Sequence, residues 1–384
     1  PQPFGLKPVR IELLPRAGAA VVMSCCGCLA WLVGRSSQER RPKSTILIQT
    51  EYGALREAIV GLGVTRVPEF GKVDWGETAL KVLPEAEAAA MRANSGKHYR
   101  DTGKFEALEK ENSDLIAVFE KFGVKVHRPL EVTDELVAMT FGQEWISHGY
   151  TQTFSRDPMF VVGSCLIELA PGSPVRRCDL LGYSRLFRER LLASGARWFQ
   201  MPAADVTVTA QPGYSKEMNL ALEGGDCMVV SPDLVLVGNS QNTSVGSSAM
   251  GIDWLRTILE PEGFSVERVR LREDFLHLDC CLSIPRRGLA IVCKEAFVDG
   301  LPEALRGWDL VETTVEAARL LACNGLALDP SNFIIGYNDQ EDGSALKAAL
   351  EARGIKVHMV YFASHNEDGG GIRCATHGLF REAV

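Results

Sequence analysis

The sequence lacks a regular spacing of cysteines, an excess of basic residues and, outside one segment, any long uncharged run. Its 11 cysteines are scattered over 384 residues, which argues against a disulfide framework and favours reduced thiols in a reducing compartment. The net charge of −8 argues against a nucleic-acid-binding surface, because such a surface must be basic. With 46% hydrophobic and 23% charged residues, the composition is that of a globular protein rather than a disordered, collagen-like or polytopic membrane chain.

The one long uncharged run lies near the N-terminus, at residues 17–34 (AGAAVVMSCCGCLAWLVG), between Arg16 and Arg35. Two interpretations stay open, a signal or membrane anchor and a disordered extension. We expect residues 1–44 to be an extension of one of these kinds and residues 45–384 to form the functional domain. A cytoplasmic location is expected, unless residues 17–34 direct the protein to a membrane or an organelle.

One pattern recurs after residue 44: an amphipathic helix, a glycine at its C-terminal end, and a strand with alternating apolar residues. Two short apolar runs around a turn precede each helix and predict a β-hairpin. The first unit is less regular and carries an insertion over residues 73–104. Five such units suggest a ring with strands inside and helices outside; an α+β domain with similar helices is the alternative. The five glycines are Gly123, Gly195, Gly263, Gly307 and Gly354.

Residues suited to acid–base, nucleophilic or ionic chemistry occur near the start of the predicted hairpins of these units, and a ring would bring them together. Three glycines before Cys374 allow a sharp turn that exposes the thiol beside backbone amides. His277 and Asp279 lie two residues apart, so on a strand they share one face. The whole set is Arg156, Asp157, Glu223, Asp226, His277, Asp279, Asn324 and Cys374.

Each candidate alone also has a structural interpretation: a buried cysteine in a glycine-rich loop, a local salt bridge between Arg156 and Asp157, or solvated acids at a turn. A metal site is a further alternative. Its residues would be His277, Asp279, Cys280, Cys281 and Cys293. Their spacing fits no standard zinc pattern, and adjacent cysteines on a strand point to opposite faces. No metal or other cofactor is therefore expected.

Taken together, the candidates suit the chemistry of a guanidino group. A guanidinium is planar and permanently charged, and carboxylates can hold its N–H groups in a bidentate manner. Its carbon is a poor electrophile, so the attack needs a strong, soft nucleophile such as a thiolate. The departing amine needs a general acid, which a histidine oriented by a carboxylate can provide.

The ordered motifs resemble those of the guanidino-group-modifying enzymes, which comprise amidinotransferases, arginine and agmatine deiminases, and dimethylarginine hydrolases. Five motifs occur in a fixed order between Gln49 and the C-terminus: EYGALREAIVG, RD before a strand, EGGD, HxD and GGGxxC. The resemblance implies the pentein fold, an α/β five-bladed pseudo-symmetric propeller of ββαβ repeats. The stretches NSQNTS and MGIDWLRTILEPEGFSVERV are more similar to the glycine and inosamine-phosphate amidinotransferases than to the deiminases.

The same resemblance implies roles for individual residues. Cys374 matches the nucleophile that forms a covalent amidino-cysteine, His277 matches the general acid and base, and Glu223 matches its orienting carboxylate. Asp157 and Asp279 match the pair that grips the guanidinium. Three further residues are assigned to substrate binding: Arg156, Asp226 and Asn324.

Three positions depart from the amidinotransferase pattern. The arginine that helps to bind the donor's carboxylate is missing near Lys294, Ala322 stands where a serine is found, and Arg373 stands where many relatives have histidine. These departures concern the donor rather than the reaction class.

We therefore expect an amidinotransferase that moves an amidino group from a guanidino donor, L-arginine first, to an amine. A hydrolase of the same fold is one alternative, because water could resolve the same intermediate. A non-catalytic binding protein is another, because a ribosome-binding translation factor resembles this propeller; that factor lacks the cysteine, histidine and acids. The expected partners are a small-molecule donor and an amine acceptor, without nucleic acid; a homo-oligomer is left open.

Overall fold

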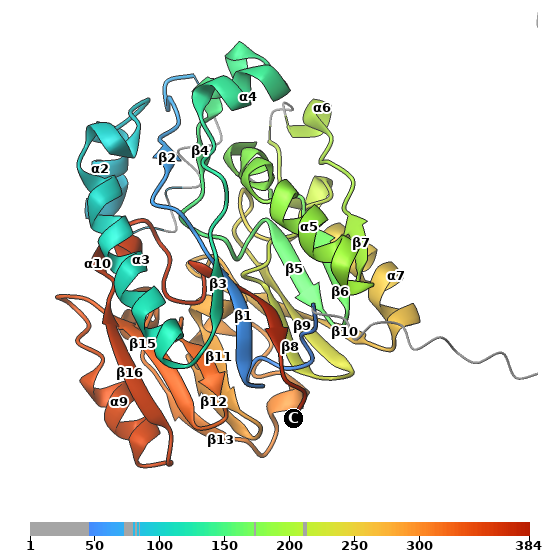
Figure 1. Cartoon of the computed structure of the whole chain (residues 1–384), viewed down its shortest axis with the longest axis vertical. Coiled ribbons are helices and arrows are strands. Elements are labelled where there is room, and N and C mark those ends of the chain that lie inside the picture. The colour runs from blue at the N-terminus through green and yellow to red at the C-terminus, as the bar shows by residue number, and fades with distance from the viewer. Residues whose placement is uncertain (1–45, 73–79, 81–82, 84, 173, 210–212) are drawn as a thin grey trace, which may run out of the picture. The chain divides into compact units, whose positions relative to one another are not determined.

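The computed structural model describes residues 46–72, 80, 83, 85–172, 174–209 and 213–384 (Figure 1). The predicted extension, residues 1–44, lies outside the described residues. No helix in these described ranges is long and apolar enough to cross a membrane.

Five three-stranded sheets of the same topology make up most of the described chain. Each sheet has one antiparallel pair and a third strand that runs parallel to the middle one. The sheets are β17-β1-β3 (Thr376–Arg381, Leu55–Val60, Lys125–His127), β5-β6-β7 (Met159–Val162, Cys165–Glu168, Arg197–Gln200), β8-β9-β10 (Cys227–Ser231, Leu234–Ser240, Ser265–Leu271), β11-β12-β13 (Leu282–Arg286, Leu289–Val292, Asp309–Glu312) and β14-β15-β16 (Leu326–Asp329, Asn332–Tyr337, Lys356–Tyr361). A two-stranded sheet pairs β2 (Thr65–Arg66) with β4 (Tyr150–Thr151).

Helices supply the crossover that a parallel strand pair requires. Four sheets have an α-helix between their middle and third strands: α3 (Lys104–Lys121), α5 (Ser184–Ser194), α7 (Ala249–Leu259) and α9 (Ser344–Glu351). All five glycines predicted to end helices have positive φ, the backbone conformation that a left-handed C-cap needs. The remaining α-helices of the described residues are α2 (Glu85–Ala93, in the predicted insertion), α4 (Asp134–Phe141), α6 (Val206–Thr209), α8 (Val315–Arg319) and α10 (Ala363–Glu367).

The sheet β11-β12-β13 departs from the predicted repeat, because no α-helix joins β12 to β13. Its connection holds two short 3-10 helices, Lys294–Ala296 and Glu303–Leu305. Between them Gly300 has a φ of 79°, and Pro302 has no N–H to donate, so a continuous helix is interrupted. The predicted helix is therefore wrong in this unit, although the strand after Gly307 is present.

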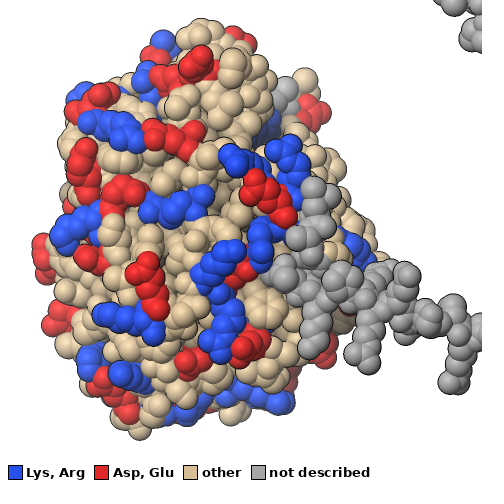
Figure 2. Space-filling view, viewed as in Figure 1, with Lys and Arg blue, Asp and Glu red and all other residues tan. Residues whose placement is uncertain are grey.

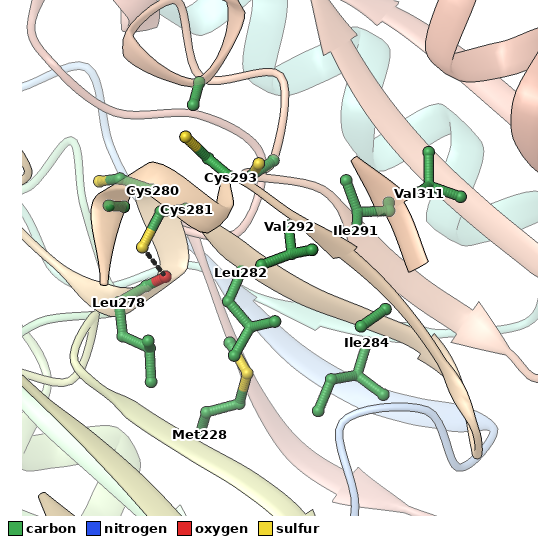
Figure 3. Close-up of a cluster of buried hydrophobic side chains, with 14 of the residues drawn as sticks. Met228, Leu278, Cys280, Cys281, Leu282, Ile284, Ile291, Val292, Cys293 and Val311 are labelled. Atoms are coloured by element: carbon green, nitrogen blue, oxygen red, sulfur yellow. Dashed lines mark hydrogen bonds between the residues drawn. The ribbon is translucent and has the colours of Figure 1, made fainter. Parts of the chain in front are cut away.

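Apolar side chains of neighbouring sheets pack into continuous cores. One core joins the three strands of β11-β12-β13 with β8 and includes Met228, Leu282, Ile284, Ile291 and Val311 (Figure 3). The described cysteines are free and buried. Several of them, such as Cys281 and Cys323, pack in the apolar core as small side chains.

The fold class is α/β, as predicted. Strand pairs form only within each sheet of the described chain, so closure of the sheets into a five-bladed ring stays a prediction. On the face shown in Figure 2, basic and acidic side chains are interspersed.

Candidate active site

The candidate residues occupy the same place in each of the five sheets. They lie in the turns that lead into the edge strand of each antiparallel pair, namely β5, β8, β11, β14 and β17. Asp157, Asp226, Asn324 and Cys374 come one or two residues before their strands, and Asp279 lies in a 3-10 helix (Leu278–Cys280) just before β11. Residues far apart in the sequence therefore meet at the corresponding ends of five equivalent sheets.

His277 and Glu223 form a buried pair. The Nε2 atom of His277 lies 2.5 Å from Oε2 of Glu223, and its Nδ1 atom lies 3.7 Å from Oδ1 of Asp157. The other oxygen of Glu223 accepts the Gly172 N–H at 3.0 Å. This geometry allows Glu223 to orient the imidazole, and it leaves Nδ1 on the side of Asp157.

Opposite charges hold this pair in its ionised form. Burial lowers the pKa of His277, but the carboxylates of Asp157, Asp226 and Glu223 outweigh it and raise the pKa to about 10. Burial raises the pKa of Glu223, but the hydrogen bond and the charge of His277 outweigh burial and lower this pKa to about 2. An imidazolium is thus available as a general acid at neutral pH.

Cys374 lies beside Asp279 and Asn324. Its Sγ atom is 3.6 Å from Oδ2 of Asp279 and accepts from Nδ2 of Asn324 at 3.1 Å. Oδ1 of Asn324 accepts the backbone N–H groups of Arg373 and Cys374, so this side chain fixes the turn that carries the thiol. Burial raises the pKa of Cys374 well above its usual value, and the charges of Asp279 and Asp157 raise it further. A bound cation would oppose that effect and favour the thiolate.

The two aspartates expected to grip a guanidinium each contact an arginine of the chain. Arg176 Nη1 lies 2.9 Å from Oδ2 of Asp157, and Arg373 Nη1 lies 3.0 Å from Oδ2 of Asp279. Oδ1 of Asp157 accepts the Gly225 N–H at 3.0 Å. Arg176 was missed in the sequence, since no motif marks it. Arg373 was noticed only as a departure from relatives.

Two residues assigned to substrate binding contact the protein instead. Asp226 accepts the backbone N–H of Leu278 and of Ser247, each at 3.0 Å, and it is fully buried. Arg156 donates from Nε to the Arg373 carbonyl at 3.3 Å. These contacts tie the turns of the site together and give no support to substrate contact by either side chain.

A cavity of about 320 Å³ opens beside this cluster. Four residues of its wall are neighbours of the candidates. Leu276 and Cys280 are adjacent in sequence to His277 and Asp279, Arg176 contacts Asp157, and Gly369 begins the glycine run before Cys374. The candidates themselves are almost completely buried behind this wall. The cavity therefore adjoins the turns that carry the candidates.

The metal-site alternative finds no support. No group of three His, Cys, Asp or Glu residues in the described part of the chain is placed to hold a metal ion. Cys280 and Cys281 point in different directions (Figure 3), and the Cys281 thiol contacts the Leu278 carbonyl at 3.4 Å.

Comparisons with known proteins agree on one group of enzymes, although no family model matches the sequence. The chain is 24% identical to an L-arginine:L-lysine amidinotransferase of Pseudomonas savastanoi pv. phaseolicola, over 88% of this chain and 95% of the relative. It is 27% identical to a putative inosamine-phosphate amidinotransferase 2 of Streptomyces griseus, over 88% and 97%.

A solved structure shares the fold. It is an inosamine-phosphate amidinotransferase from Streptomyces griseus, with a TM-score of 0.69 at 21% identity, covering 89% of this chain and 98% of that chain. Together with the sequence relatives, it confirms the predicted resemblance to the guanidino-group-modifying superfamily and supports an amidinotransferase enzyme.

Proposed function

We propose that this relative of the guanidino-group-modifying enzymes moves an amidino group from a guanidino donor to an amine through a covalent intermediate on Cys374. L-arginine is the first candidate for the donor. The observation that carries the proposal is the buried cluster of Cys374, the His277–Glu223 pair, Asp157 and Asp279. No one of these residues would suffice, but together they are the nucleophile, proton donor and anionic grip that the reaction needs.

In the first half of the reaction, the cationic donor lies against Asp157 and Asp279, and its charge favours the thiolate of Cys374. The sulfur attacks the guanidino carbon and forms the C–S bond. His277, protonated at the outset, gives a proton to the leaving nitrogen as the C–N bond breaks. The donor leaves as a free amine, and the amidino group stays on the sulfur.

In the second half, the now neutral His277 takes a proton from the incoming amine. The amine attacks the amidino carbon, the C–S bond breaks, and the thiolate is regenerated. Glu223 stabilises the imidazolium at both stages. Water in place of the amine would hydrolyse the same amidino-cysteine to urea and regenerate the thiol.

Product analysis tests this proposal. The protein is incubated with isotopically labelled arginine, with and without a panel of amines, and Cys374→Ser serves as the matched control. Repeated turnover to ornithine and a new labelled guanidine is expected only with an amine and only in the parent protein, whereas without an amine at most one ornithine per site should be released. A mass increase on the peptide that contains Cys374, after rapid acid quenching, would identify the intermediate. Ornithine and urea formed without dependence on an amine would replace transfer by hydrolysis of this intermediate, citrulline and ammonia would show that the other C–N bond of the donor breaks, and no product with any donor would contradict all of these reactions.

The proposal extends to the architecture. We take the five equivalent sheets as blades of one ring, since the turns before their antiparallel edge strands all deliver candidate residues to one cluster. Residues 45–384 are then the catalytic domain. A cytoplasmic location, a homo-oligomer and the absence of nucleic-acid partners stay expectations.

A further inference from the structure

Arg373 precedes the candidate nucleophile and is 1% exposed. Its guanidinium lies between two carboxylates. Nε and Nη2 contact the two oxygens of Glu51 at 3.2 and 3.1 Å, and Nη1 contacts Oδ2 of Asp279 at 3.0 Å. Nη2 also donates to the Cys227 carbonyl at 2.8 Å. A planar fork can make these contacts at once, whereas the single ammonium of a lysine cannot.

The two oxygens of Asp279 have different surroundings. Oδ2 accepts from Arg373 and lies 3.6 Å from the Cys374 sulfur, whereas Oδ1 meets, among the described residues, only the thiols of Cys280 and Cys374, each at 3.8 Å. A thiol is a weak donor, so Oδ1 keeps its capacity to accept an N–H group. That capacity lies beside the sulfur of Cys374, where the carbon of a donor would have to be.

Glu51 holds the other side of Arg373. Oε1 of Glu51 also accepts the Val229 N–H at 3.0 Å. Burial acts to raise the pKa of Glu51, but the charges of Arg373 and Arg156 bring it down to about 2. The cavity that adjoins Glu51 and Arg373 is only about 10 Å³, about the space of one water. The guanidinium therefore has little room to change partners.

We infer that Arg373 is a positioning residue for the donor: it holds Oδ2 of Asp279 so that Oδ1 receives an N–H of the donor guanidinium, and Glu51 holds Arg373. The inference rests on the proposed function, from which it takes its ligand. Arg373 does not touch the donor in this arrangement. Its contribution is to keep the carboxylate from rotating away from the thiol.

The test compares two buried arginines. Arg373→Lys keeps the charge but removes the fork. Arg381→Lys is the matched control, because Arg381 is 4% exposed and its Nη1 contacts the carbonyls of Gly53 and Ala327 rather than a site carboxylate. Both changes are made with Cys374→Ala, so that arginine and agmatine can be titrated by calorimetry without turnover.

Both variants should lose thermal stability, but only Arg373→Lys should bind the guanidino compounds at least about tenfold more weakly. Arg381→Lys should bind them within about twofold of its parent, since lysine keeps the charge at this position and Arg381 makes no hydrogen bond to a carboxylate of the site. In the protein that keeps Cys374, Arg373→Lys should raise KM for the donor more than it lowers kcat. Equal weakening in both variants, or unchanged binding in a folded Arg373→Lys variant, would overturn the inference.

Glu51→Gln decides the matter if Arg373→Lys does not fold. It keeps the size of the side chain and removes one charge from Arg373, so binding should weaken about threefold or more. Unchanged binding in that variant would overturn the inference. If the Cys374→Ala protein with Arg373 and Glu51 intact binds neither compound, the proposed function itself fails, which separates the two results.

Discussion

At the scale of single residues, the thiol of Cys374 is buried with its pKa raised, so its reactivity depends on the charge brought by the ligand. Cys374→Ser is expected to reduce turnover by more than about a thousandfold, because a serine hydroxyl is a much weaker nucleophile without a base that removes its proton. The thermal midpoint should change little, since the side chain keeps its size. Activity within tenfold of the parent would remove Cys374 from the proposed chemistry.

The His277–Glu223 pair should govern stability as a function of pH. Because folding raises the pKa of His277 from 6.5 to about 10, its stabilising contribution is full below about pH 6.5 and is lost as the pH rises to 10. Because folding lowers the pKa of Glu223 from 4.5 to about 2, the stabilising contribution of Glu223 is present above pH 4.5 and is lost as the pH falls to 2.

Glu223→Gln is therefore expected to lower the free energy of unfolding by about 3 kcal/mol near pH 6, because it leaves a buried imidazolium without its partner. The difference from the parent should shrink towards pH 10, where His277 loses its proton in both proteins. Urea unfolding at pH 6, 8 and 10 measures this trend. A difference that stays constant over this range would show that the pair is not ionised.

At the scale of elements, the Gly224–Gly225 turn before β8 allows three segments to approach closely. A Cβ on Gly225 would lie 2.5 Å from Nδ1 of His277 and 2.9 Å from Oδ1 of Asp157. Neither distance can be tolerated, so the imidazole and the carboxylate would have to move. The glycine is thus required by the packing of other segments, and its own φ does not demand it.

Gly225→Ala is expected to lower kcat/KM by about a hundredfold, because a shift near 1 Å misplaces the proton donor. Gly71→Ala is a suitable control, since no atom of the described residues lies within 4 Å of the added Cβ. Turnover and far-ultraviolet circular dichroism measured on both variants separate misplacement from unfolding. Full activity in Gly225→Ala would contradict the assigned position of His277.

At the scale of the whole molecule, the first sheet is assembled from both ends of the described chain. β1 pairs with the C-terminal strand β17 on one edge and with β3 on the other (Figure 1). Arg381 and Leu379 of β17 are buried. The last strand therefore completes the same sheet that the first strand begins.

Truncation before Thr376 is expected to abolish folding, because it exposes an edge of β1 and removes buried apolar contacts. Removal of Ala383 and Val384 alone should be tolerated, as both residues are exposed. Soluble yield and thermal melting of the two truncated proteins measure the difference. A cooperative transition at the parent's midpoint in the longer truncation would show that β17 is dispensable.

Much of the site could be predicted because it is carried by short motifs. Cys374, His277, Glu223, Asp157 and Asp279 were each identified from a few adjacent residues, and the structure brings them together. The assignment of Arg156 and Asp226 to substrate binding was weaker, since a motif does not tell whether a polar side chain faces a ligand or a backbone amide. The helix predicted before Gly307 is wrong. Gly300 and Pro302 interrupt a helix in this segment, and a prediction from the apolar pattern gave these two residues too little weight.

By itself, the sequence determined the repeated units and the glycines that end their helices, because a left-handed cap is a local demand on one residue. Only the tertiary structure decided the partners of Asp157 and Asp279, the two aspartates proposed to grip the guanidinium. Arg176 is 19 residues from Asp157, and Arg373 is 94 residues from Asp279. Such pairs leave no local pattern, because burial and opposite charge select them only after the sheets have come together.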